Sequence, residues 1–427
     1  MKKFFMSVAA LAGMMSLAAC SSDDIVSPAD NDVQTIQIAV ASTGDKATRG
    51  RDLNSEEPDQ KIESVTVVIR NKATNAVVYK GDIPKWNTVS STYTDNGHGR
   101  KYTLKLEGAD RLNAGEYTIT AVGYTADDFK TNTIVDAKKG EVAAGNFTAE
   151  VADGKAAQEA FAGESSIKLL EDHAAINPSV TLHRQVAGYY GYFTSIPVEV
   201  NSKKVTDVRL VARSKNMKLT YGNFNSSFTT TNKDIMYVVN GSEPATTKDA
   251  KFKGSADNDA YTLYNIKVDA WFTKGDTNND GILDEKDALT EGGWTNALAK
   301  KGYLTYQPGT IFAGGFAVPF AATDAATLEL QLLDESGEIL KSWTVAMATP
   351  QPAGQGVDGV ALTVSETAQN FSFFRNHMYT LGKKVDNTKD KPGTTTPDQP
   401  EPLDKSQSMI LRVNDNWEVI NRMTIGD

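Results

Sequence analysis

The sequence predicts an all-β protein built from two β-sandwich domains in tandem. Most of the chain alternates apolar and polar residues at period two, which is typical of strands with one buried face. Clusters of Gly, Asn and Asp separate these short segments, as they do in sandwiches. Only residues 156–161 and 284–290 look helical. A chain of 427 residues has room for about two domains of ordinary size.

The alternating segments follow one another as candidate strands joined by polar turns. Residues 71–75 turn the chain between the candidate strands 65–69 and 77–79. Residues 334–337 turn it between the candidate strands 328–332 and 339–345. Each segment has apolar side chains on one face, so each can cover one side of a sandwich core. We expect strands at residues 65–69, 77–79, 102–106, 117–121, 328–332 and 339–345.

Changes in composition place the domain boundaries. Residues 150–178 are rich in Ala and Glu, lack strand alternation and precede a strong candidate strand at 180–187. We therefore expect the first sandwich over residues 50–172 and the second over residues 173–384. Residues 385–402 are rich in Lys, Asp, Thr and Pro, a composition that predicts an extended, flexible linker.

The segment after this linker, residues 403–427, predicts a tethered amphipathic strand. Most of its apolar residues fall on odd positions, whereas Arg412 and Asn414 fall on even positions. A lone strand cannot cover its own apolar face or pair its edges, so this tail has no evident place within its own subunit. The apolar positions that we expect to be buried on pairing are Met409, Leu411, Val413, Trp417 and Val419.

The amino terminus predicts export and lipidation. Lys2 and Lys3 precede an apolar stretch, residues 4–17, that is too short to span a bilayer and is typical of a signal peptide. The stretch leads into a Leu-Ala-Ala-Cys sequence that has the form of a lipobox. We therefore expect a signal peptide over residues 1–20, a lipid on Cys20 and a precursor anchored in the outer membrane. An ordinary signal peptide with an incidental cysteine is the alternative.

A free-standing first strand follows the lipidated end. Ile36, Ile38 and Val40 alternate with polar or small residues, and a polar stretch containing Arg49 and Arg51 comes next. Exposed arginines in a flexible loop are accessible to a trypsin-like protease. Such arginines are more often simply solvated, so the wider context has to decide between these interpretations.

Composition excludes several classes of function. The net charge of −10 argues against nucleic acid as a partner, and Cys20 is the single cysteine, which leaves no disulfide. The four histidines have neither metal spacing nor a partner serine motif. We expect no enzymatic activity, and we expect His183 and His377 to be packed or surface residues. Tyr189, Tyr190, Tyr192 and Phe193 either stack on sugar rings or fill both faces of a sandwich strand.

One motif is specific for a metal ion. Residues 276–287 fit the twelve-residue calcium loop, with oxygen ligands at alternate positions and Gly281 at the sharp turn. The flanks depart from the usual helices, because residues 268–272 look like a strand. An Asp- and Asn-rich surface turn is the alternative to a Ca²⁺ site. The expected ligands are Asp276, Asn278, Asp280, the Ile282 carbonyl, Asp284 and Asp287.

The order of these features resembles the fimbrillins, the subunits of type V pili. A lipobox, a first strand, an arginine site, two candidate sandwiches and a strand-like tail follow one another over nearly the whole chain. Residues 180–187 look like the strand that opens the second domain, residues 376–382 like its last strand, and residues 413–417 like the tail. Each string is weak by itself, and their order carries the resemblance.

The resemblance implies transthyretin-like sandwiches and a structural, adhesive role on the cell surface. In fimbrillins an arginine-specific protease removes the first strand, here residues 21–49, and the vacated groove accepts a strand of the next subunit. The resemblance thus implies that residues 403–427 are a donor strand and that the partners are other pilus subunits. A surface glycan-binding lipoprotein is the alternative, and it would need neither the arginine site nor the tail.

Overall fold

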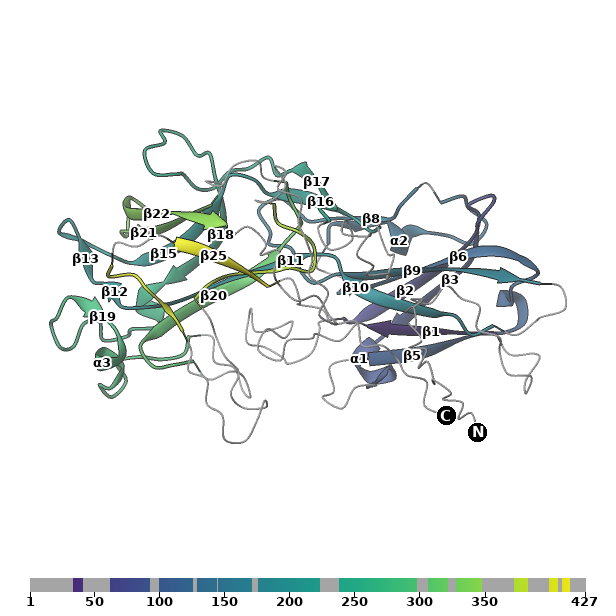
Figure 1. The fold of residues 1–427 in the computed structure, drawn as a ribbon, viewed down its shortest axis with the longest axis horizontal. Coiled ribbons are helices and arrows are strands. Elements are labelled where there is room, and N and C mark those ends of the chain that lie inside the picture. The colour runs from purple at the N-terminus through teal and green to yellow at the C-terminus, as the bar shows by residue number, and fades with distance from the viewer. Residues whose placement is uncertain are drawn as a thin grey trace, which may run out of the picture.

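The computed structural model describes residues 34–40, 62–92, 100–125, 129–143, 145–170, 176–222, 238–297, 306–321, 328–347, 372–382, 399–405 and 409–414. Strands make up almost all of the regular structure, which confirms the all-β prediction. Figure 1 shows two lobes along the long axis, with β1, β2, β6 and β10 in one and β11, β15, β22 and β25 in the other.

The first lobe is built on an eight-stranded sheet with the order β3-β2-β6-β9-β10-β1-β5-β4. All neighbouring strands are antiparallel except β1 and β10, which run parallel. The strands are β1 (Gln34–Val40), β2 (Ser64–Asn71), β3 (Val77–Pro84), β4 (Ser91–Thr92), β5 (Arg100–Leu106), β6 (Gly115–Tyr124), β9 (Phe161–Leu169) and β10 (Ser179–Arg184).

The second lobe is built on a nine-stranded sheet with the order β18-β15-β21-β22-β25-β23-β11-β20, and β24 also pairs with β11. Its strands are β11 (Ala187–Thr194), β15 (Asp207–Ala212), β18 (Tyr261–Lys267), β20 (Thr310–Ala317), β21 (Leu328–Leu333), β22 (Ile339–Met347), β23 (Met378–Leu381), β24 (Glu401–Pro402) and β25 (Met409–Asn414).

Short elements complete the fold. A four-stranded sheet of order β17-β16-β8-β7 joins the two halves of the chain, and two small ribbons pair β12 with β19 and β13 with β14. These strands are β7 (Thr131–Asn132), β8 (Thr148–Glu150), β12 (Ile196–Pro197), β13 (Glu199–Val200), β14 (Lys203–Lys204), β16 (Asn216–Thr220), β17 (Gly241–Pro244) and β19 (Ile282–Leu283). The helices are α1 (Trp86–Val89), α2 (Thr133–Asp136), α3 (Glu285–Ala288) and the 3-10 turns Gly108–Asp110 and Val268–Ala270.

The lobes are packed together as well as connected. One core cluster contains side chains of the first lobe, such as Val122 and Phe147, together with the aromatic residues of β11. At the junction, Arg184 and Glu159 form a fully buried ion pair at 2.8 Å. Only Gln185 and Val186 separate β10 from β11, so one almost continuous path of strand runs from the first sheet into the second.

Several sequence predictions about the middle of the chain are wrong. Residues 156–160 are not helical, and the Ala-rich segment contains β9, whose small residues permit a close approach of β10. A Cβ on Gly163 would lie 2.0 Å from the Thr181 carbonyl oxygen. The strand predicted to open the second domain includes β10, which instead belongs to the first sheet. The strand predicted at 268–272 begins with a 3-10 turn.

Candidate functional site

The first strand lies inside the first sheet, between two partners. β1 pairs antiparallel with β5 from Gln34 to Val40 and parallel with β10 from Gln37 to Val40. The Thr35 and Gln37 amides also donate to the carbonyls of Ile176 and Pro178, at 2.9 and 2.8 Å. The predicted strand is therefore confirmed, and both of its edges are paired.

The side chains of β1 belong to the core of the first lobe. Ile36 and Ile38 are 0% exposed and Val40 is 1% exposed. They pack in one cluster with Trp86 and Leu182. Burying an aliphatic side chain of this size stabilises a fold by about 1.5–3 kcal/mol. Removing β1 would take these contacts away and expose the facing edges of β5 and β10.

A buried glutamine fixes the register of β1. The Gln34 side chain is almost fully buried, and its amide group donates to the Leu112 carbonyl at 2.9 Å. Its carbonyl oxygen accepts from the Leu112 backbone amide at 2.7 Å. The sequence analysis missed this residue because it is polar, although it lies in phase with Ile36 and Ile38. A one-residue slip of β1 would break both bonds and turn its apolar face outward.

The described strands on either side of residues 41–61 are not neighbours in the sheet. β2 is the next described strand after β1, yet β6, β9 and β10 lie between the two. Residues 41–61, which make this connection, lie outside the described residues, and so do Arg49 and Arg51. The signal peptide and Cys20 lie outside them too. Cleavage and lipidation therefore stay predictions.

The tail takes part in the second sheet of its own chain. In β25, Met409–Leu411 pair parallel with β22, and Arg412–Asn414 pair antiparallel with β23. The expectation that the tail has no place in its own subunit is therefore wrong. Period-two alternation predicts a strand but does not identify its partners. The pairing of the tail with β22 and β23 could therefore not be predicted from the sequence. Trp417 and Val419 lie outside the described residues.

The end of the predicted linker is also packed on the second lobe. β24 runs parallel to β11, with Glu401 opposite Phe193 and Pro402 opposite Thr194. Leu403, the first residue of the predicted tail, is 0% exposed and belongs to the core of this lobe. The described residues 399–405 are thus part of the second domain and not a flexible linker.

The predicted calcium loop forms a compact turn held by its own hydrogen bonds. Asp287 is fully buried, and its carboxylate accepts from the amides of Thr277 and Asp284 at 2.8 and 3.0 Å. It caps α3 together with Asp284, in agreement with the helix predicted at 284–290. Both oxygens of Asp276 accept backbone amides, those of Asn279 and Gly281.

This arrangement does not fit a metal ion as it stands. The Lys286 ammonium lies 2.6 Å from the Asp280 carboxylate. The hydrogen bond from Lys286 is the main cause of the lowered pKa of Asp280. Within the described ranges, no group of three or more His, Cys, Asp or Glu side chains stands close enough to hold a metal. The backbone of Ile282 pairs in β19 with that of Pro197, and Asn278 hydrogen-bonds Asp280. Calcium binding stays a prediction from the sequence pattern.

The aromatic residues of β11 fill the core and do not form a sugar platform. Tyr189, Tyr190, Tyr192 and Phe193 are all buried. Burial raises the pKa of Tyr189, whose hydroxyl donates to the Leu263 carbonyl at 2.9 Å. The interpretation that the rings lie on both faces of a sandwich strand is confirmed. His377 is likewise packed, with its Nδ1 atom 2.8 Å from a backbone carbonyl oxygen.

Comparisons with known proteins give distant similarities of structure. No family model and no curated protein matches the chain. Similar solved structures include a fimbrial assembly protein from Parabacteroides distasonis, at 14% identity and a TM-score of 0.35, covering 83% of this chain and 93% of that one. A fimbrial anchor protein from Porphyromonas gingivalis is similar at 11% identity and a TM-score of 0.36, over 82% and 90% of the two chains.

In the described part of the chain the longest helices have four residues, and none is long and apolar enough to cross a bilayer.

Proposed function

We propose that the protein is a structural subunit of a surface fimbria and assembles by strand exchange. An arginine-specific protease would release β1, and a strand of the next subunit would take its place. One observation carries the proposal. β1 is paired on both edges and covers the core with Ile36, Ile38 and Val40. Its covalent connection to the other strands of the sheet runs through residues 41–61, which contain the predicted cleavage sites.

The slot left by β1 has the properties of a strand acceptor. The facing edges of β5 and β10 would present unpaired backbone groups above an apolar floor, which is the arrangement used in β-augmentation. An incoming strand that buries about six apolar side chains gains roughly 9–18 kcal/mol before costs. This gain is comparable to the whole stability of a domain, so assembly would be hard to reverse.

The tail is the proposed donor, and its place in its own sheet adds a step. β25 has to leave β22 and β23 before it can enter the slot of a neighbour. Donor and acceptor then lie at opposite ends of the chain, so the contact repeats head to tail and yields an open filament. The proposal also includes a lipid on Cys20 that holds the precursor in the outer membrane, and adhesion without enzymatic activity.

The experiment blocks the proposed cleavage. Wild type and a double variant, Arg49→Ala with Arg51→Ala, are compared in the native host by amino-terminal sequencing of surface material and by polymer ladders on denaturing gels. We expect wild-type polymers to begin after Arg49 or Arg51, and we expect the variant to remain monomeric and lipidated. Polymers that begin at Cys20 would refute the proposal.

A further inference from the structure

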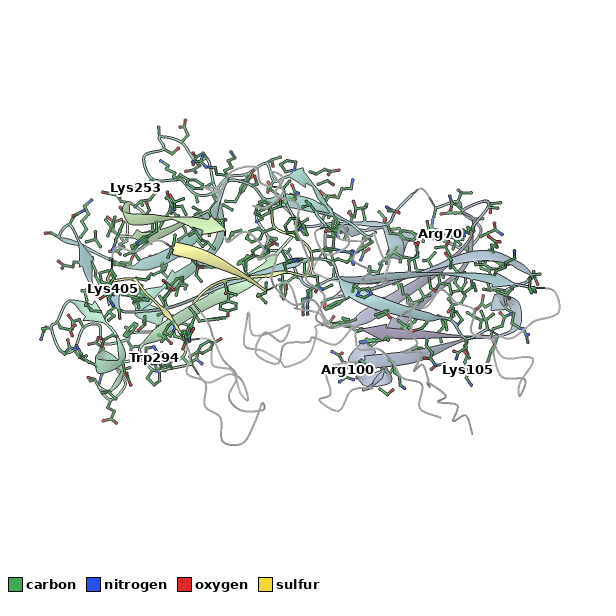
Figure 2. The ribbon with its side chains drawn as sticks, in the orientation of Figure 1. Arg70, Arg100, Lys105, Lys253, Trp294 and Lys405 are labelled. Atoms are coloured by element: carbon green, nitrogen blue, oxygen red, sulfur yellow. The ribbon has the colours of Figure 1, made fainter. Side chains whose placement is uncertain are left out.

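Residues 399–405 form a second attachment of the carboxyl-terminal segment, separate from β25. We call these residues the tail anchor. The Leu403 amide donates to the Thr194 carbonyl at 3.0 Å, directly after the pairing of β24 with β11. The Leu403 side chain is completely buried in the core of the second lobe. Figure 2 places the labelled Lys405 in this lobe, far from Arg100 and Lys105 of β5 beside the β1 slot.

A lysine from β22 holds the end of the tail anchor. The Lys341 ammonium lies 3.5 Å from the Leu403 carbonyl oxygen and 3.4 Å from that of Lys405. The same ammonium stands over the Trp343 ring, 4.4 Å from its centroid. Burial lowers the pKa of Lys341. The partly desolvated Lys341 ammonium contacts the carbonyls of Leu403 and Lys405 and so stabilises the observed conformation of the tail anchor.

A close approach of the backbone shows that the tail anchor fits tightly. Gly382 ends β23 with a φ of +75°, a conformation that favours glycine. A Cβ at this position would lie 2.3 Å from the Tyr192 carbonyl oxygen and 3.1 Å from the Glu401 amide nitrogen. The strand end, β11 and the tail anchor therefore come together where a larger residue has no room.

We propose that the tail anchor stays in its own subunit when β25 moves to a neighbour, so that exchange involves only residues after Lys405. This inference rests on the proposed function. It makes Leu403 and Lys341 positioning residues, because they fix the point at which the connecting segment leaves its subunit. If the tail anchor pulled out, the connection would lengthen and successive subunits would be spaced less regularly.

The unequal attachments of the two segments explain why exchange stops at the tail anchor. Each described residue of β25 is paired on one side only, with β22 or with β23. Its transfer replaces these bonds by equivalent ones in a neighbour. The buried side chain of Leu403 would instead lose its contacts in the core of the second lobe. The β1 slot of a neighbour matches only the seven residues Gln34–Val40, and the proposal fills it with residues after Lys405.

The test follows backbone amides by hydrogen–deuterium exchange in the full-length precursor and in the polymer. We expect the Leu403 amide to stay protected in both. We expect peptides of β5 and β10 to be protected in the polymer after β1 has been lost. Absence of any wild-type polymer would overturn the proposed function, and the tail anchor's role with it. Polymers in which the Leu403 amide exchanges freely would overturn the tail anchor alone.

Variants separate positioning from simple stability. Lys341→Met keeps an apolar stem near Trp343 but removes the contacts with both carbonyls, and we expect exchange at Leu403 to be about tenfold faster. Polymers of Lys341→Met should show irregular subunit spacing by electron microscopy. Polymers of Leu403→Ala should also show irregular spacing. Leu403→Met should restore regular spacing.

The matched control is Lys203→Met, which removes an exposed ion pair with Glu338 on the same lobe. We expect this variant to keep wild-type exchange and spacing. Regular spacing in both Lys341→Met and Leu403→Ala polymers would contradict the proposal, because neither residue would then position the connection.

Discussion

The first and last strands of the described chain each lie between two other strands of a sheet, but they pair with these neighbours differently. β1 and β25 each lie parallel to one neighbour and antiparallel to the other, inside a sheet made by the rest of a lobe. In β1, Gln37–Val40 are registered with both neighbours. In β25, Met409–Leu411 meet only β22 and Arg412–Asn414 meet only β23. β1 is thus an interior strand, whereas the described part of β25 bridges two strand edges.

The chain segments that connect β1 and β25 to the rest of the protein also differ. β1 leads into residues 41–61, which contain the two candidate cleavage sites. β25 follows the tail anchor, which is buried at Leu403. A cut before β2 would free β1 from its lobe, while the tail would remain attached to its own. The strand that is paired on both edges over Gln37–Val40 is therefore the one whose connection contains the predicted cleavage sites.

The largest expected effect comes from a charge in the β1 core. Ile38→Asp places a carboxylate where the side chain is fully buried, so we expect the first lobe to lose more than about 4 kcal/mol of unfolding free energy. Denaturant unfolding of the precursor measures this loss. Thr35→Ala, at a half-buried position of the same strand, is the control and should change stability by about 0.5–1 kcal/mol. Equal effects would mean that β1 is not a core strand.

Truncation after Lys405 tests the other half of the comparison. Removing residues 406–427 takes away β25 but keeps Leu403, so we expect both lobes to stay folded, with a stability loss confined to the second. Polymer ladders should disappear. Truncation after Pro402 removes Leu403 as well and should cost about 2–5 kcal/mol more. Circular dichroism measures folding and denaturing gels show the polymer ladders. Ladders formed by the chain truncated after Lys405 would exclude the tail as donor.

Single substitutions in the tail sharpen this test. The alternation predicts that Leu411→Asp or Val413→Asp abolishes polymerisation, because an unpaired carboxylate in the acceptor slot is heavily disfavoured. Arg412→Asp, on the opposite face, should have a much smaller effect.

A smaller effect is expected in the predicted calcium loop of the second lobe. Asp287→Ala leaves the half-buried amides of Thr277 and Asp284 without their acceptor, so we expect a loss of about 2–4 kcal/mol. Calcium is tested by melting curves of wild type with Ca²⁺ and with chelator. A stabilising shift that Asp276→Ala with Asp280→Ala removes would establish the site. Identical wild-type curves would refute it.

The smallest expected effect is a dependence on pH at Asp207, the first residue of β15 in the second sheet. Burial alone would raise the pKa of Asp207, but hydrogen bonds from Lys267, Thr206 and Asn265 outweigh it and lower that pKa. A lowered carboxyl pKa stabilises the fold above the unfolded value of about 3.9, and this contribution is lost as pH falls through the folded pKa. We expect acid unfolding of the second lobe to become less steep below about pH 4 in Asp207→Asn. An unchanged slope would contradict this role.

Local pattern was enough to predict many elements of the fold. Val65, Val67 and Ile69 alternate in β2, and Asp334 and Gly337 turn the chain before β22, as expected. The pattern failed where burial is not one-sided. β9 was missed because Ala162 and Gly163 are small to admit the neighbouring strand, and small residues carry little alternation. A 3-10 turn was mistaken for a strand because Val268 and Phe272 are both buried there.

The sequence by itself determined that segments such as residues 65–69, 117–121 and 328–332 are strands. It also determined that Ile36, Ile38 and Val40 share a buried face and that a helix follows Asp284. Only the tertiary structure decided that β1 lies between β5 and β10 and that β25 lies in its own lobe. The physical reason is that alternation depends on one strand and its solvent, whereas pairing depends on the edges that distant segments leave open. Gln34 and Leu403 fix those pairings through contacts that no local pattern contains.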